Sequence, residues 1–376
     1  MRVYLDNAAT TPLDPEVLQE MYKMMESQFG NPSSIHSHGR EARTVVEKAR
    51  KTVAALLNTS ASEIFFTSGG TEADNMAIRC GITDNRIKHA VTTRIEHHAV
   101  LHTLEAMHKS GLIELRFADI DEKGNINLEH LEQLLSSHER SFVSLMHANN
   151  EIGTLTDIAA VGELCKKYDA LFHCDTVQTM GHYPIDLQQV HVHFVTCAAH
   201  KFHGPKGAGF LYINHKVKIN PLIFGGAQER NMRGGTENLY GIVGLAKALE
   251  LASSHMEEHR EYIQGLKSYM IERLRKDIPG VEFNGEIDPE KSLYTVLNVL
   301  FPETDLADML LFNLDISGIS VSGGSACSSG TNIGSHVLEG ISSDPNRPAI
   351  RFSFSKLNTR EEIDFVLAKL KVLFVD

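Results

Sequence analysis

Short apolar runs alternate with amphipathic stretches along much of the chain. The runs are rich in β-branched and aromatic residues and predict strands at 63–66, 89–93, 142–146, 170–174 and 192–197. Between them, apolar residues recur at helical spacing over 38–57, 71–80, 98–109 and 156–168. Strands that alternate with helices form a mostly parallel sheet covered by helices, and the loops at the carboxyl ends of such strands bind ligands. We therefore predict an α/β fold and expect the chemistry in those loops.

The pattern changes after about residue 250. A long charged helix is followed by a strand-forming segment around 293–301 and by a closing helix from about 359. We therefore predict a large domain over 15–252 and a smaller α+β domain made of 1–14 and 253–376. Since no Pro-rich linker or internal repeat separates them, the two domains are expected to pack together.

The charge balance and the cysteine content exclude several classes of protein. The 376 residues include 36 Lys and Arg against 48 Asp and Glu, a net charge of −12, which disfavours a nucleic-acid partner. No apolar run reaches the roughly 18 residues of a membrane span, and the start resembles no signal peptide. The five cysteines are scattered and form no CxxC pair, so we expect free thiols. A cytoplasmic protein without membrane contact is predicted.

One lysine and one aspartate are expected at the same edge of the sheet. Lys201 lies in CAAHKFHGPKGAGFLY (197–212), between a predicted buried strand and a Gly- and Pro-rich turn. A lysine is usually an exposed loop residue, because lysines are rarely buried without a partner. However, Asp175 ends another predicted strand, ALFHCD. A desolvated lysine there can form a Schiff base, and a buried aspartate can hold a proton on a pyridine nitrogen.

TSGGTEADN (67–75) is a Gly-rich turn between a predicted strand and a helix. Backbone N–H groups at the helix start, together with the Thr71 hydroxyl, can bind a phosphate because the helix dipole and the unpaired donors favour an anion. The motif is neither a Walker loop nor GxGxxG. Taken alone, it is equally consistent with a plain helix cap at Thr71 followed by Glu72.

SGGSACSSG (322–330) surrounds Cys327 with serine and glycine, a composition typical of a flexible, exposed loop. A lone thiol in such a loop indicates a nucleophile that has to move, and an inert surface thiol is the alternative. The other four cysteines lie in apolar stretches, where we expect buried core residues.

Taken together, the motifs resemble those of the cysteine desulfurases of the NifS/IscS class, which are class-V aminotransferase-like, fold type I pyridoxal-phosphate (PLP) enzymes. Ten segments appear in the family's order: YLDNAATTP (4–12), GNPSSIHSHG (30–39), TSGGTEADN, EHHAVL (96–101), MHANNEIGT (146–154), HCDTVQ (173–178), AHKFHGPKG (199–207), MRGGTEN (232–238), SGGSACSSG and IRFSFS (350–355). The resemblance implies a homodimer that binds PLP in its large domain and carries a mobile cysteine loop in its small domain. The implied reaction converts L-cysteine to L-alanine.

The resemblance implies four residues that carry the chemistry. Lys201 matches the Schiff-base lysine, and Asp175 matches the partner of the pyridinium nitrogen. His97 matches the histidine that stacks on the cofactor ring and relays protons, with a helix-capping or core histidine as the alternative. Cys327 matches the nucleophile that takes the sulfur as a persulfide. The sulfur would then pass to an acceptor protein, either an iron–sulfur scaffold or a tRNA-thiolation enzyme.

Further residues match the family's binding positions. Those expected at the cofactor are Gln178 and Asn150 near the ring oxygen, Gly70, Thr71 and His200 at the phosphate, and Thr236, which reaches the phosphate from the neighbouring subunit. Arg351 is expected to bind the substrate carboxylate through its planar fork of donors, with help from Asn31. Ala198 stands where many members have a serine that contacts the phosphate, which removes about 1 kcal/mol of binding.

Other interpretations stay open at this point. A cysteine or selenocysteine lyase or an aminotransferase would use the same scaffold, because a fold does not determine a reaction. Cys327 favours persulfide transfer, since those reactions need no thiol there. A non-catalytic sulfur-carrier platform is disfavoured by the complete set of chemical residues. No metal site is predicted, because the pair His191 and His193 has no acidic or cysteine ligand nearby in sequence.

Overall fold

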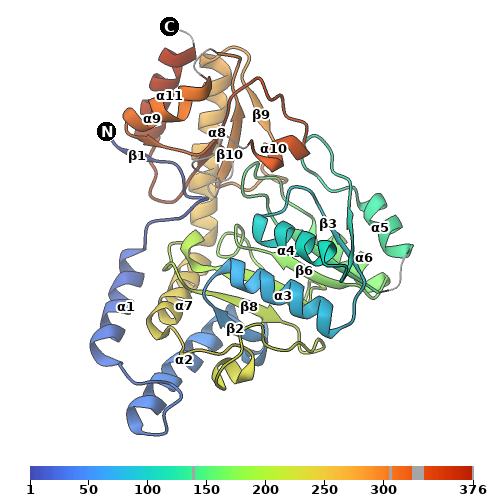
Figure 1. The fold of residues 1–376 in the computed structure, drawn as a ribbon. Coiled ribbons are helices and arrows are strands. Elements are labelled where there is room, and N and C mark those ends of the chain that lie inside the picture. The colour runs from blue at the N-terminus through green and yellow to red at the C-terminus, as the bar shows by residue number, and fades with distance from the viewer. Residues whose placement is uncertain (138–139, 305–306, 324–333, 375–376) are drawn as a thin grey trace.

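The computed structural model describes residues 1–137, 140–304, 307–323 and 334–374 (Figure 1). Within these residues, a seven-stranded sheet has the order β2-β8-β7-β6-β5-β3-β4. The strands are β2 (Ile64–Thr67), β3 (His89–Thr92), β4 (Glu114–Phe117), β5 (Ser141–Met146), β6 (Leu171–Asp175), β7 (Phe194–Ala198) and β8 (Gly209–Ile213). Neighbouring strands run parallel, except that β8 is antiparallel to β2 and β7. The predicted mostly parallel sheet is confirmed.

Helices cover both faces of this sheet. On one face, α3 (Gly70–Asp84) and α4 (His98–Lys109) enclose an apolar cluster with Phe142 and Leu171. On the other face, a second cluster contains Val143 and Phe172. The helices of this second face are α1 (Pro15–Ser27), α2 (Ser37–Leu56), α5 (Leu128–Ser136), α6 (Ile158–Lys167) and α7 (Leu239–Ser254). Successive strand residues point to opposite faces, so each buried strand supplies both clusters. None of the described helices is long and apolar enough to span a membrane.

The C-terminal part packs around a separate core with the first residues of the chain. Its elements are α8 (Met256–Asp277), β9 (Glu282–Asn284), β10 (Val296–Leu300), α9 (Leu310–Ile316), β11 (Ile319–Ser320), α10 (His336–Gly340), β12 (Ala349–Ser353) and α11 (Arg360–Phe374). β1 (Val3–Tyr4) pairs in parallel with β11, and Val3 and Leu5 join the apolar cluster of α8 and α11. Figure 1 shows the N-terminal strand beside these C-terminal elements. This packing supports the proposed division into a large domain, 15–252, and a small domain made of 1–14 and 253–376.

The buried Lys267 on α8 makes the stability of this core depend on pH. Its Nζ donates to Ser292 Oγ at 2.6 Å and to the Leu293 carbonyl at 2.9 Å. Burial lowers the pKa of Lys267 to about 7 from an ordinary 10.5. Between these two values the unfolded chain binds more protons than the folded chain, so we expect the free energy of unfolding to rise with pH.

Replacement of Lys267 by methionine should remove this dependence. We expect the stability of the parent, relative to Lys267→Met, to increase by on the order of 3 kcal/mol between pH 7 and pH 10, measured by urea unfolding. Lys276→Met, at an exposed position on the same helix, is the control and should leave the pH dependence unchanged. Parallel curves for the parent and Lys267→Met would contradict the expectation.

Candidate active site

A cavity of about 240 Å³ lies at the carboxyl ends of β5, β6 and β7, where the sheet order places ligand-binding loops. It brings together nine of the residues predicted from the sequence: Gly70, Thr71, His97, Asn150, Asp175, Gln178, His200, Lys201 and Arg351. They come from segments spread over much of the chain. The cavity is therefore the candidate active site.

Lys201 extends into this cavity from the short turn that follows β7. Its Nζ donates to the carbonyl oxygens of Ala8 and Ala9 at 2.5 and 2.9 Å. The Ala8 carbonyl also accepts from Gln178 Nε2 at 3.1 Å. The N-terminal segment thus places the lysine amine and the glutamine amide side by side.

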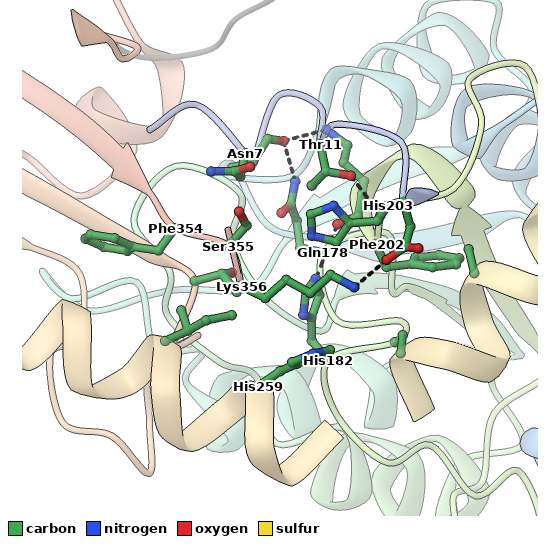
Figure 2. A pocket seen from close by; sticks show the side chains of 18 of the residues that line it. Asn7, Thr11, Gln178, His182, Phe202, His203, His259, Phe354, Ser355 and Lys356 are labelled. Carbon is green, nitrogen blue, oxygen red and sulfur yellow. Dashed lines mark hydrogen bonds and ion pairs between the residues drawn. The ribbon is translucent and has the colours of Figure 1, made fainter. Parts of the chain in front are cut away.

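Lys201 also lines a second, smaller cavity of about 30 Å³, which Figure 2 shows from close by. Figure 2 shows His182, His203 and His259 around it, with the Lys356 side chain extending across the middle of the view. His182 links the two parts of the chain, since its ring nitrogens lie 3.0 Å from Tyr294 Oη and 3.3 Å from the Lys201 carbonyl oxygen. The volume holds about one water molecule. This cavity therefore offers much less room for a substrate than the cavity of 240 Å³.

Asp175 is buried at the end of β6, where its Oδ1 accepts from Val177 N at 2.9 Å. Burial, and next the nearby charge of Asp74, raise the pKa of Asp175 to about 7. Asp74 on α3 is itself buried, and burial raises its pKa to about 7 as well. A cationic N–H group placed against Asp175 would lower that pKa and favour the carboxylate. The pair is thus suited to hold a protonated ring nitrogen.

His97 is the N-cap residue that precedes α4, and it lines the cavity. Its Nδ1 accepts from Ala99 N at 3.2 Å, so the helix-capping alternative describes part of its role. Burial, and next the charge of Lys201, lower the pKa of His97 to about 4. The ring is therefore neutral near pH 7 and carries its proton on Nε2, because Nδ1 serves as an acceptor.

The start of α3 offers an anion site. Gly69 precedes the helix with a φ of 152°, a conformation that suits glycine, and no described side chain caps the helix. The first N–H groups of the helix therefore remain available to an anion. A Cβ at Gly70 would lie 2.8 Å from Val177 Cγ2, so only glycine leaves this space open. Nearby, His200 Nδ1 lies 3.2 Å from Thr10 Oγ1.

Arg351 reaches the cavity from the middle of β12 with a side chain that is only 2% exposed. Its Nη2 donates to Asp6 Oδ1 at 2.8 Å, and its Nη1 donates to the Asn150 carbonyl at 3.0 Å. Its Nε is buried without a hydrogen-bond partner in the described part of the chain. A buried donor without a partner is costly, and a substrate carboxylate would satisfy it.

Three predicted site residues are not brought into this cavity. Thr236 lines a separate cavity of about 180 Å³ with Thr67 and Ser68, behind the Gly-rich turn. Asn31 is exposed in the loop between α1 and α2, where its Oδ1 accepts from Ser33 N at 2.9 Å. Cys327 lies in 324–333, outside the described residues. The roles of all three stay predictions.

Two acidic residues of the site were not predicted. Besides Asp74, Glu96 is buried behind His97 and accepts from Met146 N and Thr93 Oγ1, both at 3.1 Å. Burial raises the pKa of Glu96 to about 8. Both residues belong to motifs quoted above, Asp74 to TSGGTEADN and Glu96 to EHHAVL. The sequence did not show that these two residues are buried.

One group of side chains in the described residues could hold a metal ion. It consists of Asp74, His97 and Asp175, whose donor atoms lie within 4.8 Å of one another.

Comparisons with known proteins agree with this geometry. Residues 3–366 match the aminotransferase class-V family. A putative cysteine desulfurase IscS 1 of Bacillus subtilis (strain 168) is 44% identical over 367 residues, which cover 96% of each chain. A cysteine desulfurase IscS of Dictyoglomus turgidum is 42% identical and covers 98% of this chain and 93% of its own.

Solved structures show the same fold. A NifS-like protein has a TM-score of 0.91 and 39% identity, with 99% of each chain covered. A NifS-like protein from Rickettsia africae has a TM-score of 0.89 and 31% identity, with 100% of this chain and 99% of its own covered. The structure described as SspA in complex with cysteine has a TM-score of 0.83 and 28% identity, over 96% of this chain and 100% of its own. The predicted fold class and the resemblance to the NifS/IscS class are confirmed.

Proposed function

The chain belongs to the aminotransferase class-V family, and we propose that within it the protein is a PLP-dependent cysteine desulfurase. It converts L-cysteine to L-alanine and passes the sulfur to an acceptor protein. The observation that carries this proposal is a single cavity in which a lysine amine, a buried carboxyl group and an open helix start face the same space. Relatives 42–44% identical over nearly the whole chain are named cysteine desulfurases.

The donor set fits PLP, which has an aldehyde, a basic ring nitrogen and a phosphate. Lys201 Nζ suits the aldehyde, Asp175 suits the ring nitrogen, and the N–H groups at Gly70 and Thr71 suit the phosphate. A metal ion at Asp175 would leave the lysine and the open helix start without a function. When bound, PLP supplies an electron sink for the pair released as the substrate's Cα proton leaves.

The protein's own groups orient the substrate and hold protons. Arg351 Nε is the open donor for the substrate carboxylate, while Nη2 stays paired with Asp6. Neutral His97 would stack on an aromatic cofactor without adding charge, with its proton on Nε2. Asp175 would hold the ring nitrogen and keep a proton on it. Gln178 and Asn150 lie nearby, where they are proposed to contact the ring oxygen.

Cys327 is proposed to take the sulfur. Its thiolate attacks the substrate Sγ, an S–S bond forms and the Cβ–Sγ bond breaks, and the electron pair left on Cβ takes up a proton to give alanine. The enzyme is left with a persulfide, which an acceptor then removes. The proposed acceptors are an iron–sulfur scaffold protein and a tRNA-thiolation enzyme. The four described cysteines are free and buried, which supports a reducing compartment such as the cytoplasm.

A homodimer is proposed from the exposed apolar surface around α1. Large apolar side chains lie open there and on the neighbouring loops: Leu18, Tyr22, Met25, Phe29, Ile35 and Phe224. Gln228 Nε2 donates to Ser33 Oγ at 3.4 Å, so the loops after α1 and before α7 are neighbours. Exposed large apolar side chains on neighbouring segments are typical of protein interfaces. Thr236 lies on the second loop and does not line the active-site cavity of its own chain. This position supports the proposal that it contacts the phosphate bound by the partner subunit.

The proposed reaction is tested with purified protein, PLP and a reductant. We expect L-cysteine to yield alanine and sulfide in equal amounts. Cysteamine lacks the carboxylate that Arg351 would bind, so its turnover is expected to be lower by roughly 10²-fold. Formation of a keto acid in place of alanine would contradict the proposal in favour of an aminotransferase or an eliminating lyase. Absence of any turnover with bound PLP would favour the platform interpretation.

A further inference from the structure

A carboxylate lies in the first turn of α3, the turn that offers the phosphate site. Glu72 directly follows Thr71, and its side chain is only 10% exposed. Its Oε2 accepts from Ser68 N at 2.9 Å and so closes the Gly-rich turn. A negative charge this near would weaken the binding of a phosphate by repulsion unless another group neutralised it.

Arg233 neutralises this carboxylate. Its Nε donates to Glu72 Oε1 at 2.8 Å, and its Nη2 donates to Glu72 Oε2 at 3.1 Å, a two-point contact between planar groups. Burial opposes the ionisation of Glu72, but the hydrogen bonds from Arg233 and Ser68 outweigh it and hold the pKa of Glu72 below its ordinary value. The carboxylate is therefore ionised, and its charge is balanced by the guanidinium.

The backbone before Arg233 is held in an uncommon conformation. Glu229, Arg230 and Asn231 have φ values of 44°, 57° and 67°, three consecutive left-handed residues without a glycine. Such residues cost about 1 kcal/mol or more each and persist only where other contacts hold them. Both oxygens of Glu229 accept from Arg50, at 2.6 and 2.8 Å, and Oε2 also accepts from Phe66 N at 2.8 Å. Phe66 belongs to β2, which leads directly into the Gly-rich turn.

We propose that Arg233 is a positioning residue for the cofactor phosphate, because it cancels the charge of Glu72 and fixes the Gly-rich turn without touching the cofactor. The inference rests on the proposed PLP function. The proposal also explains why the left-handed residues 229–231 are retained, since they lead into the segment that places the Arg233 guanidinium beside Glu72. Thr236 follows Arg233 by three residues, so the same contact also fixes the segment offered to the neighbouring subunit.

The test compares PLP with pyridoxal, which has the same aldehyde and ring but no phosphate. Arg233→Met leaves Glu72 uncompensated, so we expect the Kd of PLP to rise about tenfold and that of pyridoxal to stay the same. In Glu72→Gln/Arg233→Met neither charge remains, and the Kd of PLP should return to within about threefold of the parent. Glu72→Gln alone should bind PLP at least as tightly as the parent. Kd values come from absorbance titration, with sedimentation velocity to verify the oligomeric state.

Arg273→Met is the matched control, because Arg273 forms a similar ion pair with Asp277 at 2.9 Å on α8, outside the site. It should change neither Kd. Equal weakening of PLP and pyridoxal by Arg233→Met, or no recovery in the double variant, would overturn the inference and assign the pair a general structural role. A parent protein that binds neither compound would instead contradict the proposed function, and the inference with it.

Discussion

Lys201→Ala should abolish the conversion of L-cysteine to L-alanine, by roughly 10³-fold or more, and should remove the yellow colour of the PLP-bound protein. The amine lines the cavity from the turn that follows β7, where it donates to the carbonyls of Ala8 and Ala9. In the proposed function, its loss would remove both the covalent link to the cofactor and a group that can move the Cα proton. Alanine formation and the visible absorbance spectrum measure the two effects separately.

Lys206→Ala is the matched control for this change. Lys206 stands in the same Gly- and Pro-rich turn but is exposed, so its loss should leave both colour and turnover at the parent level. If Lys201→Ala kept a parent-like spectrum and most of the turnover, another amine would have to hold the cofactor. The assignment of this cavity as the active site would then be wrong.

Cys327→Ser should lower alanine formation by roughly 10³-fold while PLP binding stays unchanged. A hydroxyl is a much poorer nucleophile toward sulfur than a thiolate, and no persulfide can form on it. The residue lies outside the described part of the chain, so the expectation rests on the family resemblance. Turnover with reductant present, PLP titration and mass spectrometry for a persulfide provide the measurements.

Cys80→Ser is the comparison variant. Burial, and next the charge of Asp84, raise the pKa of the Cys80 thiol to about 11, so it is not a thiolate near pH 7. We expect this variant to keep parent-like turnover. Substantial alanine formation by Cys327→Ser, with sulfide released directly, would favour the cysteine or selenocysteine lyase over persulfide transfer.

The sheet was largely predictable because most of its strands are buried on both faces. Their continuous apolar runs alternate with helical spacing, and this pattern identified β2, β3, β5, β6 and β7. β4 was not predicted, because only Leu115 of it is buried, whereas β2 at the opposite edge is buried throughout. β8 was not predicted either, although it is fully buried, because it begins on a glycine inside a turn-rich stretch.

The site was predictable where its residues belong to motifs, and less so where function depends on contacts between distant segments. Nine motif residues meet in one cavity. The ion pair of Asp6 with Arg351 joins residues 345 positions apart, and the pair of Glu72 with Arg233 joins residues 161 apart. Local spacing contains no information on such pairs. The burial of Asp74 and Glu96, which raises the pKa of each, likewise became visible only when the segments were packed.

Borohydride reduction of the PLP-saturated protein, followed by peptide mapping, tests most directly whether Lys201 carries the cofactor. Reduction converts the link between an amine and the PLP aldehyde into a stable bond that survives digestion. We expect one pyridoxyl group per chain, on the peptide that contains Lys201, and none in Lys201→Ala. A map of the saturated protein in which Lys201 is unmodified would contradict the proposed active site.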